Sequence, residues 1–442
     1  LKNEGILPLP EKGMKIAFIG EFASNPRFQG GGSANVKPYK VVSALDAVKS
    51  IAEVSYAQGF ELTEDKRNDV LFQSALKTAA EADIAVIFAG LPEQFESEGF
   101  DREHMRMPEC QDELISEITK IQENVVVVMH NGSPVEMPWA DNVKGILEAY
   151  LGGEAVGQAV VKLLFGIENP CGKLAETIPY QLSDNPSYLY FPGNGKKVEY
   201  REGVFVGYRY YDTKNMSVRF PFGHGLSYTK YEYSDLQISK DSIKDNEKLQ
   251  VAFKVKNVGD RAGKEVIQLY VADKTYSAER PKKELKGFAK VHLQPGEEKT
   301  IRMELDKRSF AWYSTEIAGW HAATGEYELL VGASSSDIRM AKTVHIVSTD
   351  VLPLKVDRNT TISELIENPK TNGIIMSLLN NMVQYLNSMQ EEGEGETAKT
   401  VQAEQLIKML ESSPLRFLNS LMGMTHEEID ELIAKIQYVL NM

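Results

Sequence analysis

The 442-residue sequence lacks several features that would assign it to a specialised class of protein. Its two cysteines, Cys110 and Cys171, are too few for a disulfide framework or a cysteine-based zinc site. Acidic residues outnumber basic ones by 63 to 49, and no long basic run is present, so nucleic acid is not an expected partner. No run of about 18 apolar residues occurs, and we expect neither a membrane span nor a membrane partner.

The start of the sequence has no initiator methionine and no signal peptide. Leu1 leads directly into a mixed segment, without the basic and apolar regions of a secretory signal. We therefore expect this sequence to be part of a longer chain, and the scarcity of cysteine favours a cytoplasmic location. The seven histidines are scattered without the His-Glu-x-x-His spacing of a zinc enzyme, and we expect no metal and no cofactor.

Residues 1–180 are predicted to form an α/β domain. Apolar runs typical of buried strands lie at residues 14–19, 54–57, 84–89, 125–129 and 145–147. Segments with helical spacing of apolar residues lie at 40–52, 65–81, 108–122 and 154–165. This alternation predicts a parallel sheet with helices on both faces, which is an α/β sandwich.

The pattern changes after residue 180. Residues 181–229 are rich in tyrosine, proline and glycine and are predicted to be a connector. Residues 230–348 show alternating apolar positions, and about seven strands are expected in an all-β sandwich of immunoglobulin type. Residues 349–442 are predicted to be a helical tail, interrupted by an acidic, glycine-containing linker at 391–396.

The segment that follows the predicted strand at 84–89 is the first candidate site. Residues 91–102 contain four carboxylates, one arginine and two phenylalanines. Ligands of open α/β sheets bind beyond the carboxyl ends of the strands, which is where this segment lies. A carboxyl group beside apolar rings has a raised pKa, as a general acid requires at neutral pH. A solvated acidic loop remains the alternative interpretation.

A glycine run at residues 30–32 is the second candidate site. It allows the backbone to approach a ligand closely, although an ordinary tight turn has the same composition. The motifs of a P-loop and of a dinucleotide-binding fold are absent, so phosphate binding is not predicted. Farther along, the aromatic residues Tyr208, Tyr210 and Tyr211 suit either a sugar platform or packing between domains.

Short motifs along the chain, taken together and in order, resemble the C-terminal half of glycoside hydrolase family 3 enzymes of the β-glucosidase and β-xylosidase type. The motifs are LKNEGILPL at residues 1–9, QGGGS at 29–33, ESEGFDR at 96–102, NPCGKL at 169–174, FPFGHGLSYT at 220–229, RPKKELKGF at 280–288 and VGASS at 331–335. The resemblance implies an α/β sandwich followed by a fibronectin type III-like domain. It also implies an N-terminal barrel domain of the same enzyme, which would carry the aspartate nucleophile and most of the sugar pocket.

The resemblance also implies roles for individual residues. Glu98 matches the general acid/base, with Glu96 as the second choice. Ser33 and Gln29 match positions near the terminal sugar, where they would contribute to substrate binding. The remaining charged pair of the motif, Asp101 and Arg102, would orient the loop through an ion pair.

The function implied is that of the C-terminal part of a retaining β-glycosidase. Its substrates would be β-linked oligosaccharides or aryl glycosides, with terminal β-glucosides as the expected class. Glu98 would protonate the leaving oxygen while the barrel aspartate attacks, and the chain alone should be inactive. The alternatives are a non-catalytic carbohydrate-binding or scaffolding fragment, and a nucleotide-binding α/β protein, which the missing phosphate motifs disfavour.

Overall fold

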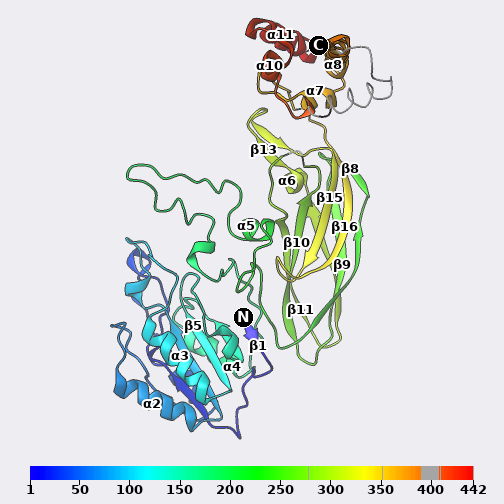
Figure 1. Cartoon of the computed structure of the whole chain (residues 1–442). Coiled ribbons are helices and arrows are strands. Elements are labelled where there is room, and N and C mark those ends of the chain that lie inside the picture. Colours follow the sequence, from blue (N-terminus) through cyan, green and yellow to red (C-terminus); the bar gives the residue numbers. More distant parts are fainter. Residues whose placement is uncertain (277, 351, 390–407, 409, 442) are drawn as a thin grey trace. The chain divides into compact units, whose positions relative to one another are not determined.

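The computed structural model describes the chain except for residues 277, 351, 390–407, 409 and 442 (Figure 1). The predicted linker at 391–396 lies outside the described residues. The chain divides into two compact units, one comprising Leu1–Tyr313 and Trp320–Asp350 and the other comprising Ser314–Gly319 and Val351–Met442. Among the helices described, none has the length and apolar character needed to cross a membrane.

The first unit begins with a six-stranded sheet. Its strands, in spatial order, are β1 (Lys2–Asn3), β6 (Gly145–Glu148), β5 (Val125–His130), β4 (Ile84–Gly90), β2 (Ile16–Ile19) and β3 (Val54–Ala57). All neighbouring pairs are parallel except β1 and β6, which are antiparallel. Every residue of β2, β4 and β5 is buried, as expected for parallel strands that are covered on both faces.

Four helices accompany this sheet. They are α1 (Ala44–Val48), α2 (Asp69–Ala80), α3 (Glu109–Ile121) and α4 (Val156–Leu164). Helix α2 begins where the Asn68 side chain accepts hydrogen bonds from the N–H groups of Val70 and Leu71, as an N-cap does. Helix α2 packs against α3, and α1 packs against α4. All the strands and helices predicted between residues 14 and 165 are therefore present, with boundaries shifted by a few residues.

The strand order places a topological switch point between β2 and β4. From β2 the chain moves outward to β3 through α1, and it then returns past β2 to β4 and continues outward to β5. Because such crossovers are right-handed, the change of direction puts α1 on one face and α2 and α3 on the other. The loops that leave β2 and β4 therefore diverge at the sheet's carboxyl edge, where α/β sheets bind ligands.

The second part of the first unit is a β-sandwich. One sheet has the order β11 (Glu284–Leu293), β10 (Gly263–Asp273), β15 (Gly325–Gly332), β16 (Ile338–Val347) and β8 (Ser242–Lys244). The other has the order β12 (Glu298–Leu305), β9 (Leu249–Asn257) and β7 (Tyr231–Ile238). Alternate residues of β9 are buried in a shared core, because successive side chains of a strand point to opposite faces. The predicted β-sandwich is thus present, with β8 as a short strand that the alternation did not reveal.

Shorter elements complete the two units. Helix α5 (Tyr208–Thr213) lies in the connector, α6 (Lys307–Phe310) follows β12, and β13 (Trp312–Ser314) pairs with β14 (Gly319–His321). The tail contains the helices α7 (Ile362–Glu367), α8 (Asn372–Met389), α10 (Leu418–Met422) and α11 (His426–Asn441), which share an apolar core. Thr361 and Glu364 form a capping box at the start of α7, which explains why the sequence predicts a helix there.

Candidate functional site

Two loops meet at the switch point because glycines let them leave their strands in close contact. Gly20 follows β2 with a φ of 107°, and a Cβ there would lie 2.2 Å from the Phe88 carbonyl oxygen. Gly90 ends β4 with a φ of 150°, and a Cβ there would lie 2.1 Å from the His130 carbonyl oxygen. No other residue type fits these two positions without moving the backbone.

Glu98 and Ser33, which the motifs single out separately, lie next to each other. The Ser33 backbone N–H donates a hydrogen bond of 2.6 Å to Glu98 Oε2. Gly32 has a φ of +71°, and a Cβ there would lie 2.4 Å from the Glu98 Cβ. The glycine-rich turn therefore closes directly over the Glu98 side chain, and its small residues are what permit the contact.

Gln29 contacts the glycine-rich turn rather than Glu98 in the hydrogen bonds described. Its Nε2 donates to Asn35 Oδ1 at 2.8 Å, and its Oε1 accepts from the Val36 N–H at 3.0 Å. These two bonds tie the beginning of the turn to its end. Gln29 thus shapes the turn that supports Ser33, while its contact with substrate stays a prediction.

The Glu98 carboxylate is exposed and acidic. Hydrogen bonds from the Ser33 side chain and then from the Ser33 N–H hold the pKa of Glu98 below its usual range. Of the two interpretations left open for residues 91–102, the raised pKa is therefore not found at Glu98, whose exposure fits the solvated acidic loop. The premise of a raised pKa was burial beside phenylalanine rings, but Glu98 is exposed and Phe100 itself is 50% exposed.

Glu96 points into the protein and forms a buried ion pair. Its Oε2 accepts from Arg27 Nη1 at 2.7 Å and from the Gly132 N–H at 2.7 Å, and its Oε1 accepts from the Ser133 hydroxyl. The side chains of Arg27 and Glu96 are only 7% and 16% exposed. Burial raises the pKa of Glu96, but the bonds from Ser133, Gly132 and Arg27 outweigh it and the pKa is lowered. Glu96 is therefore held as a structural carboxylate.

Arg102 provides a second anchor for the same loop. Its Nη1 donates to Ser133 Oγ at 2.8 Å and to the Pro134 carbonyl at 2.9 Å. Arg102 thus orients the loop as expected, but the predicted ion pair with Asp101 does not occur among the described residues, and this prediction is wrong. The acceptors of Arg102 are oxygens of Ser133 and Pro134 in the turn after β5. The same turn donates hydrogen bonds to Glu96. The segment bearing Glu98 is therefore fixed at both ends on one turn.

His130, at the end of β5, was missed by the sequence reasoning. Its ring is 2% exposed and stacks on Phe22 at 5.5 Å between centroids. Burial lowers the pKa of His130 to about 4, so the ring is neutral near pH 7. The role of His130 is to pack as an aromatic ring against Phe22 and Phe88. A single histidine outside any motif gives no sequence signal for this kind of packing.

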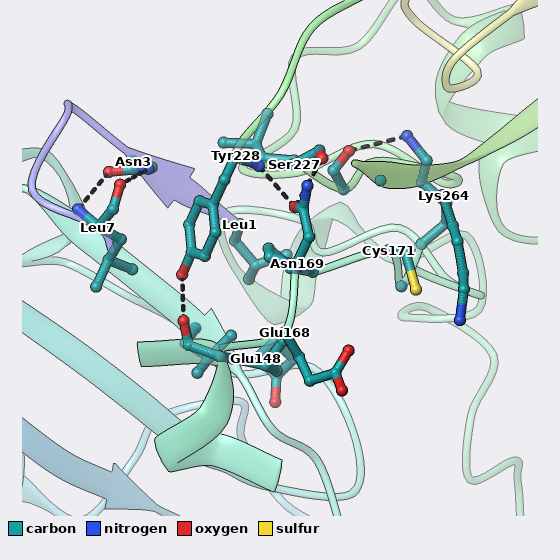
Figure 2. A pocket seen from close by; sticks show the side chains of 18 of the residues that line it. Leu1, Asn3, Leu7, Glu148, Glu168, Asn169, Cys171, Ser227, Tyr228 and Lys264 are labelled. Carbon is teal, nitrogen blue, oxygen red and sulfur yellow. Dashed lines mark hydrogen bonds between the residues drawn. The ribbon is translucent and has the colours of Figure 1, made fainter. Parts of the chain in front are cut away.

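A separate cavity of about 580 Å³ lies between the α/β part and the β-sandwich (Figure 2). At its centre Asn169 Oδ1 accepts from the Ser227 hydroxyl and the Tyr228 N–H, each at 2.8 Å, while its Nδ2 donates to the Ala262 carbonyl at 3.0 Å. Two of the family-like motifs, at 169–174 and 220–229, therefore join the α/β part to the β-sandwich. The cavity is also lined by Glu148, whose pKa burial raises to about 8.

The aromatic cluster of the connector packs between domains. The Tyr208 ring stacks on Phe222 at 4.6 Å between centroids, and Tyr211 is 3% exposed. The Tyr208 hydroxyl also accepts a hydrogen bond of 2.7 Å from the Leu285 N–H of β11. Of the two interpretations left open by the sequence, packing between domains is confirmed for Tyr208.

Comparison with known proteins agrees with this architecture. Residues 1–228 match the glycosyl hydrolase family 3 C-terminal domain, and residues 265–335 match a fibronectin type III-like domain. Thermostable beta-glucosidase B of Acetivibrio thermocellus is 46% identical over 99% of this chain and 58% of its own length. An exo-alpha-(1->6)-L-arabinopyranosidase of Bifidobacterium breve is 45% identical over 75% of this chain and 44% of its own length.

A solved structure gives the same result in three dimensions. The crystal structure of a family 3 beta-glucosidase from Bifidobacterium adolescentis superposes with a TM-score of 0.79 and 42% identity. The match covers 85% of this chain and 55% of that one, so the chain spans about half the length of these relatives. With the family domain matching more than half of its residues, this chain belongs to glycosyl hydrolase family 3 and corresponds to the C-terminal half of its enzymes.

Proposed function

We propose that this chain supplies Glu98 as the general acid/base of a retaining β-glycosidase that hydrolyses terminal β-linked sugars. The observation that carries this proposal is the contrast between the two candidate carboxylates. Glu96 is partly buried and accepts three hydrogen bonds from side chains and backbone of the protein, whereas Glu98 is exposed at the switch point and held by Ser33. Of these two carboxylates Glu98 is the exposed one, and exposure to the substrate is what proton exchange requires.

In this proposal the nucleophile is an aspartate of a barrel domain that belongs to the same enzyme. The aspartate attacks the anomeric carbon and forms a glycosyl ester, while Glu98 gives its proton to the departing oxygen. Water then displaces the aspartate, and Glu98 takes a proton from that water, which restores both carboxyl groups. In such enzymes the two carboxyl groups lie about 5–5.5 Å apart.

The low pKa of Glu98 fits a site that is completed by a second domain. In the exposed state Glu98 is ionised near neutral pH and has no proton to donate. Docking of a barrel would remove water from Glu98 and bring the nucleophile's negative charge close to it, and both effects raise a carboxyl pKa. The chain alone is therefore expected to lack hydrolytic activity.

Relatives from several organisms are named beta-glucosidases, which favours β-glucosides as the substrate class. Two proteins of similar identity to this chain, 46% and 45%, are a beta-glucosidase and an arabinopyranosidase. Sequence identity to this chain therefore does not distinguish relatives that cleave different sugars. We infer that the choice of terminal sugar depends mainly on the barrel domain.

The test is Glu98→Ala in the longer protein that includes the barrel domain. Glycosides with poor leaving groups, such as alkyl glucosides, need a proton and should lose about 10²–10⁴-fold in kcat/KM. Aryl glucosides with strongly activated leaving groups should lose far less. Equal losses of kcat/KM on both substrates would exclude the acid role of Glu98. If the unmodified barrel-containing protein had no activity, the alternative of a non-catalytic fragment would be favoured.

A further inference from the structure

The loop that follows β2 is attached at several points to a segment that follows β6. This loop comprises residues 28–43 and contains the glycine-rich turn, and its residues 32–37 are all exposed. The segment, residues 152–157, has the sequence GGEAVG and continues into α4. Because β5 and β4 lie between β6 and β2 in the sheet, the attachment is made by the segments that follow the strands and not by the strands themselves.

Backbone groups of the GGEAVG segment hold the start and the end of the loop. The Gly153 N–H donates to the Phe28 carbonyl at 2.9 Å. The Val42 N–H donates to the Glu154 carbonyl at 2.9 Å, and the Gly157 N–H donates to the Val42 carbonyl at 3.1 Å. The loop is therefore fixed both where it leaves the first strand and where it returns to the body of the α/β part.

The Glu154 side chain adds a bond within the exposed part of the loop. Its Oε1 accepts a hydrogen bond of 2.6 Å from the Tyr39 N–H, although the two residues are 115 positions apart. The Tyr39 side chain is 97% exposed, so its ring does not anchor the loop. Hydrogen bonds to an ionised carboxylate are shorter and stronger than those between neutral groups. The Glu154 carboxylate is thus a side-chain anchor for a largely exposed segment.

A short stretch of chain, residues 34–38, connects this anchor to Ser33. The two hydrogen bonds of Gln29 close the near end of the stretch, and Glu154 fixes its far end. Directly before the stretch, the Ser33 N–H donates to Glu98 Oε2. A backbone N–H can position its acceptor only where the backbone itself is held. Release of the far end would therefore let Ser33 move relative to Glu98.

We propose that Glu154 is a positioning residue of the site, which holds the glycine-rich turn and, through Ser33, keeps the general acid/base Glu98 in place. The inference rests on the proposed function for the role of Glu98. Glu154 acts through the backbone of Tyr39 and Ser33, and not on the substrate. The site then depends on the segment after β6 in addition to the loops after β2 and β4.

The 442-residue chain itself tests the anchor. Glu154→Ala removes the acceptor of the Tyr39 N–H, whereas Glu154→Gln keeps an amide oxygen that can accept the same bond. The pKa of Glu98, measured by carboxyl ¹³C NMR with Glu98→Gln for assignment, should rise toward its ordinary value in Glu154→Ala, because the Ser33 bonds that lower it are weakened. In Glu154→Gln the pKa of Glu98 should stay close to that of the unmodified chain.

The matched control is Glu123→Ala. Glu123 is an exposed glutamate just before β5, at the opposite edge of the sheet from the loop of Glu98, and its replacement should leave the pKa of Glu98 unchanged. Circular dichroism would verify that all variants fold. A rise of the Glu98 pKa in Glu154→Ala alone is the result expected for an anchor that acts through one hydrogen bond.

Kinetics of the barrel-containing protein give a second readout. Glu154→Ala should lower kcat for alkyl glucosides about tenfold, with smaller changes in KM and in the rate for activated aryl glucosides, because the position of the acid is what is disturbed. Glu154→Gln should recover most of this loss. A role in folding alone would lower the rates for both kinds of glucoside alike.

Two outcomes would overturn the proposal. One is an unchanged pKa of Glu98 in Glu154→Ala, and the other is an equal loss of kcat in Glu154→Ala and Glu154→Gln. The proposed function is tested separately by Glu98→Ala. If Glu98→Ala showed the acid role and Glu154→Ala had no effect, only the positioning role of Glu154 would be refuted.

Discussion

The Ser33 N–H donates to Glu98 Oε2 over 2.6 Å, although the two residues are 65 positions apart in the sequence. The contact exists because β2 and β4 are neighbours and their loops leave the same edge of the sheet. Ser33 holds Glu98 through its backbone as well as its side chain, so the conformation of the glycine-rich turn sets the position of the carboxylate.

Gly32→Ala should therefore damage the site without a large effect on the fold. The added Cβ would lie 2.4 Å from the Glu98 Cβ at a φ of +71°, so the turn or the side chain must move. A misplacement of about 1 Å costs on the order of 10²-fold in rate, and we expect that loss of kcat/KM in the barrel-containing protein.

Gly30→Ala is the matched control for Gly32→Ala. A Cβ at Gly30 meets its nearest neighbour, the Ala34 Cβ, at 3.4 Å, which is an ordinary contact. This variant should keep most of the activity. If both alanine variants lost activity equally, the turn would matter as a whole and not through its contact with Glu98.

The Arg27–Glu96 pair should contribute to stability as a unit. Arg27→Met leaves the partly buried Glu96 carboxylate without its cation but with the bonds from Gly132 and Ser133, so the loss should stay below the roughly 3–5 kcal/mol of a fully buried pair and above about 1 kcal/mol. Urea denaturation of the 442-residue chain measures this change in the free energy of unfolding. The control is Lys49→Met, which breaks an exposed ion pair with Asp46 in the same domain and should cost far less. Equal losses in the two variants would contradict a structural role for the pair.

Much of the fold could be predicted because its strongest elements have strong local signals. The strands β4 and β5 are buried throughout and appear in the sequence as uninterrupted apolar runs. The strands β1 and β8 have only two and three residues, and β1 is the polar pair Lys2–Asn3, so no pattern reveals them. They form only because a partner strand already offers a free edge.

The sequence proposed residues for the candidate site that the fold brings together, but it did not reveal their electrostatics. The motifs identify Glu98 and Ser33, and the sheet order then brings them together. The Arg27–Glu96 bond joins residues 69 positions apart, and it depends on which strands are neighbours, which the sequence does not state. The composition of residues 91–102 left open whether the carboxyl groups are buried or solvated, because burial cannot be deduced from nearby phenylalanines, and the structure shows Glu98 exposed with a lowered pKa.

Glu148 should make the stability of the first unit depend on pH. Burial raises its pKa from 4.5 to about 8, and the nearby Glu176 acts in the same direction. Between these values the folded state keeps a proton that the unfolded state has released, so stability falls as the pH rises from about 4.5 to 8.

Glu148→Gln removes this titration and should become progressively more stable than the unmodified chain as the pH rises through that range. Thermal unfolding between pH 5 and 8 measures the difference. Glu168→Gln, an exposed residue of the same cavity, serves as the control and should show no such trend. A Glu148→Gln profile parallel to that of the unmodified chain would show that Glu148 is ionised in the folded protein.

Asn169 should couple the α/β part to the β-sandwich. Its side chain makes three hydrogen bonds, to Ser227, Tyr228 and Ala262, and replacement by alanine leaves all three partners without it (Figure 2). Loss of such bonds at a partly buried junction costs about 1–3 kcal/mol, and we expect Asn169→Ala to lower the free energy of unfolding by that amount. Asn142→Ala, at an exposed site of the α/β part, should change it by less than about 0.5 kcal/mol. Because the junction links two cores, calorimetry of Asn169→Ala should also separate their unfolding transitions, and a single unshifted transition would show that other contacts hold the two parts together.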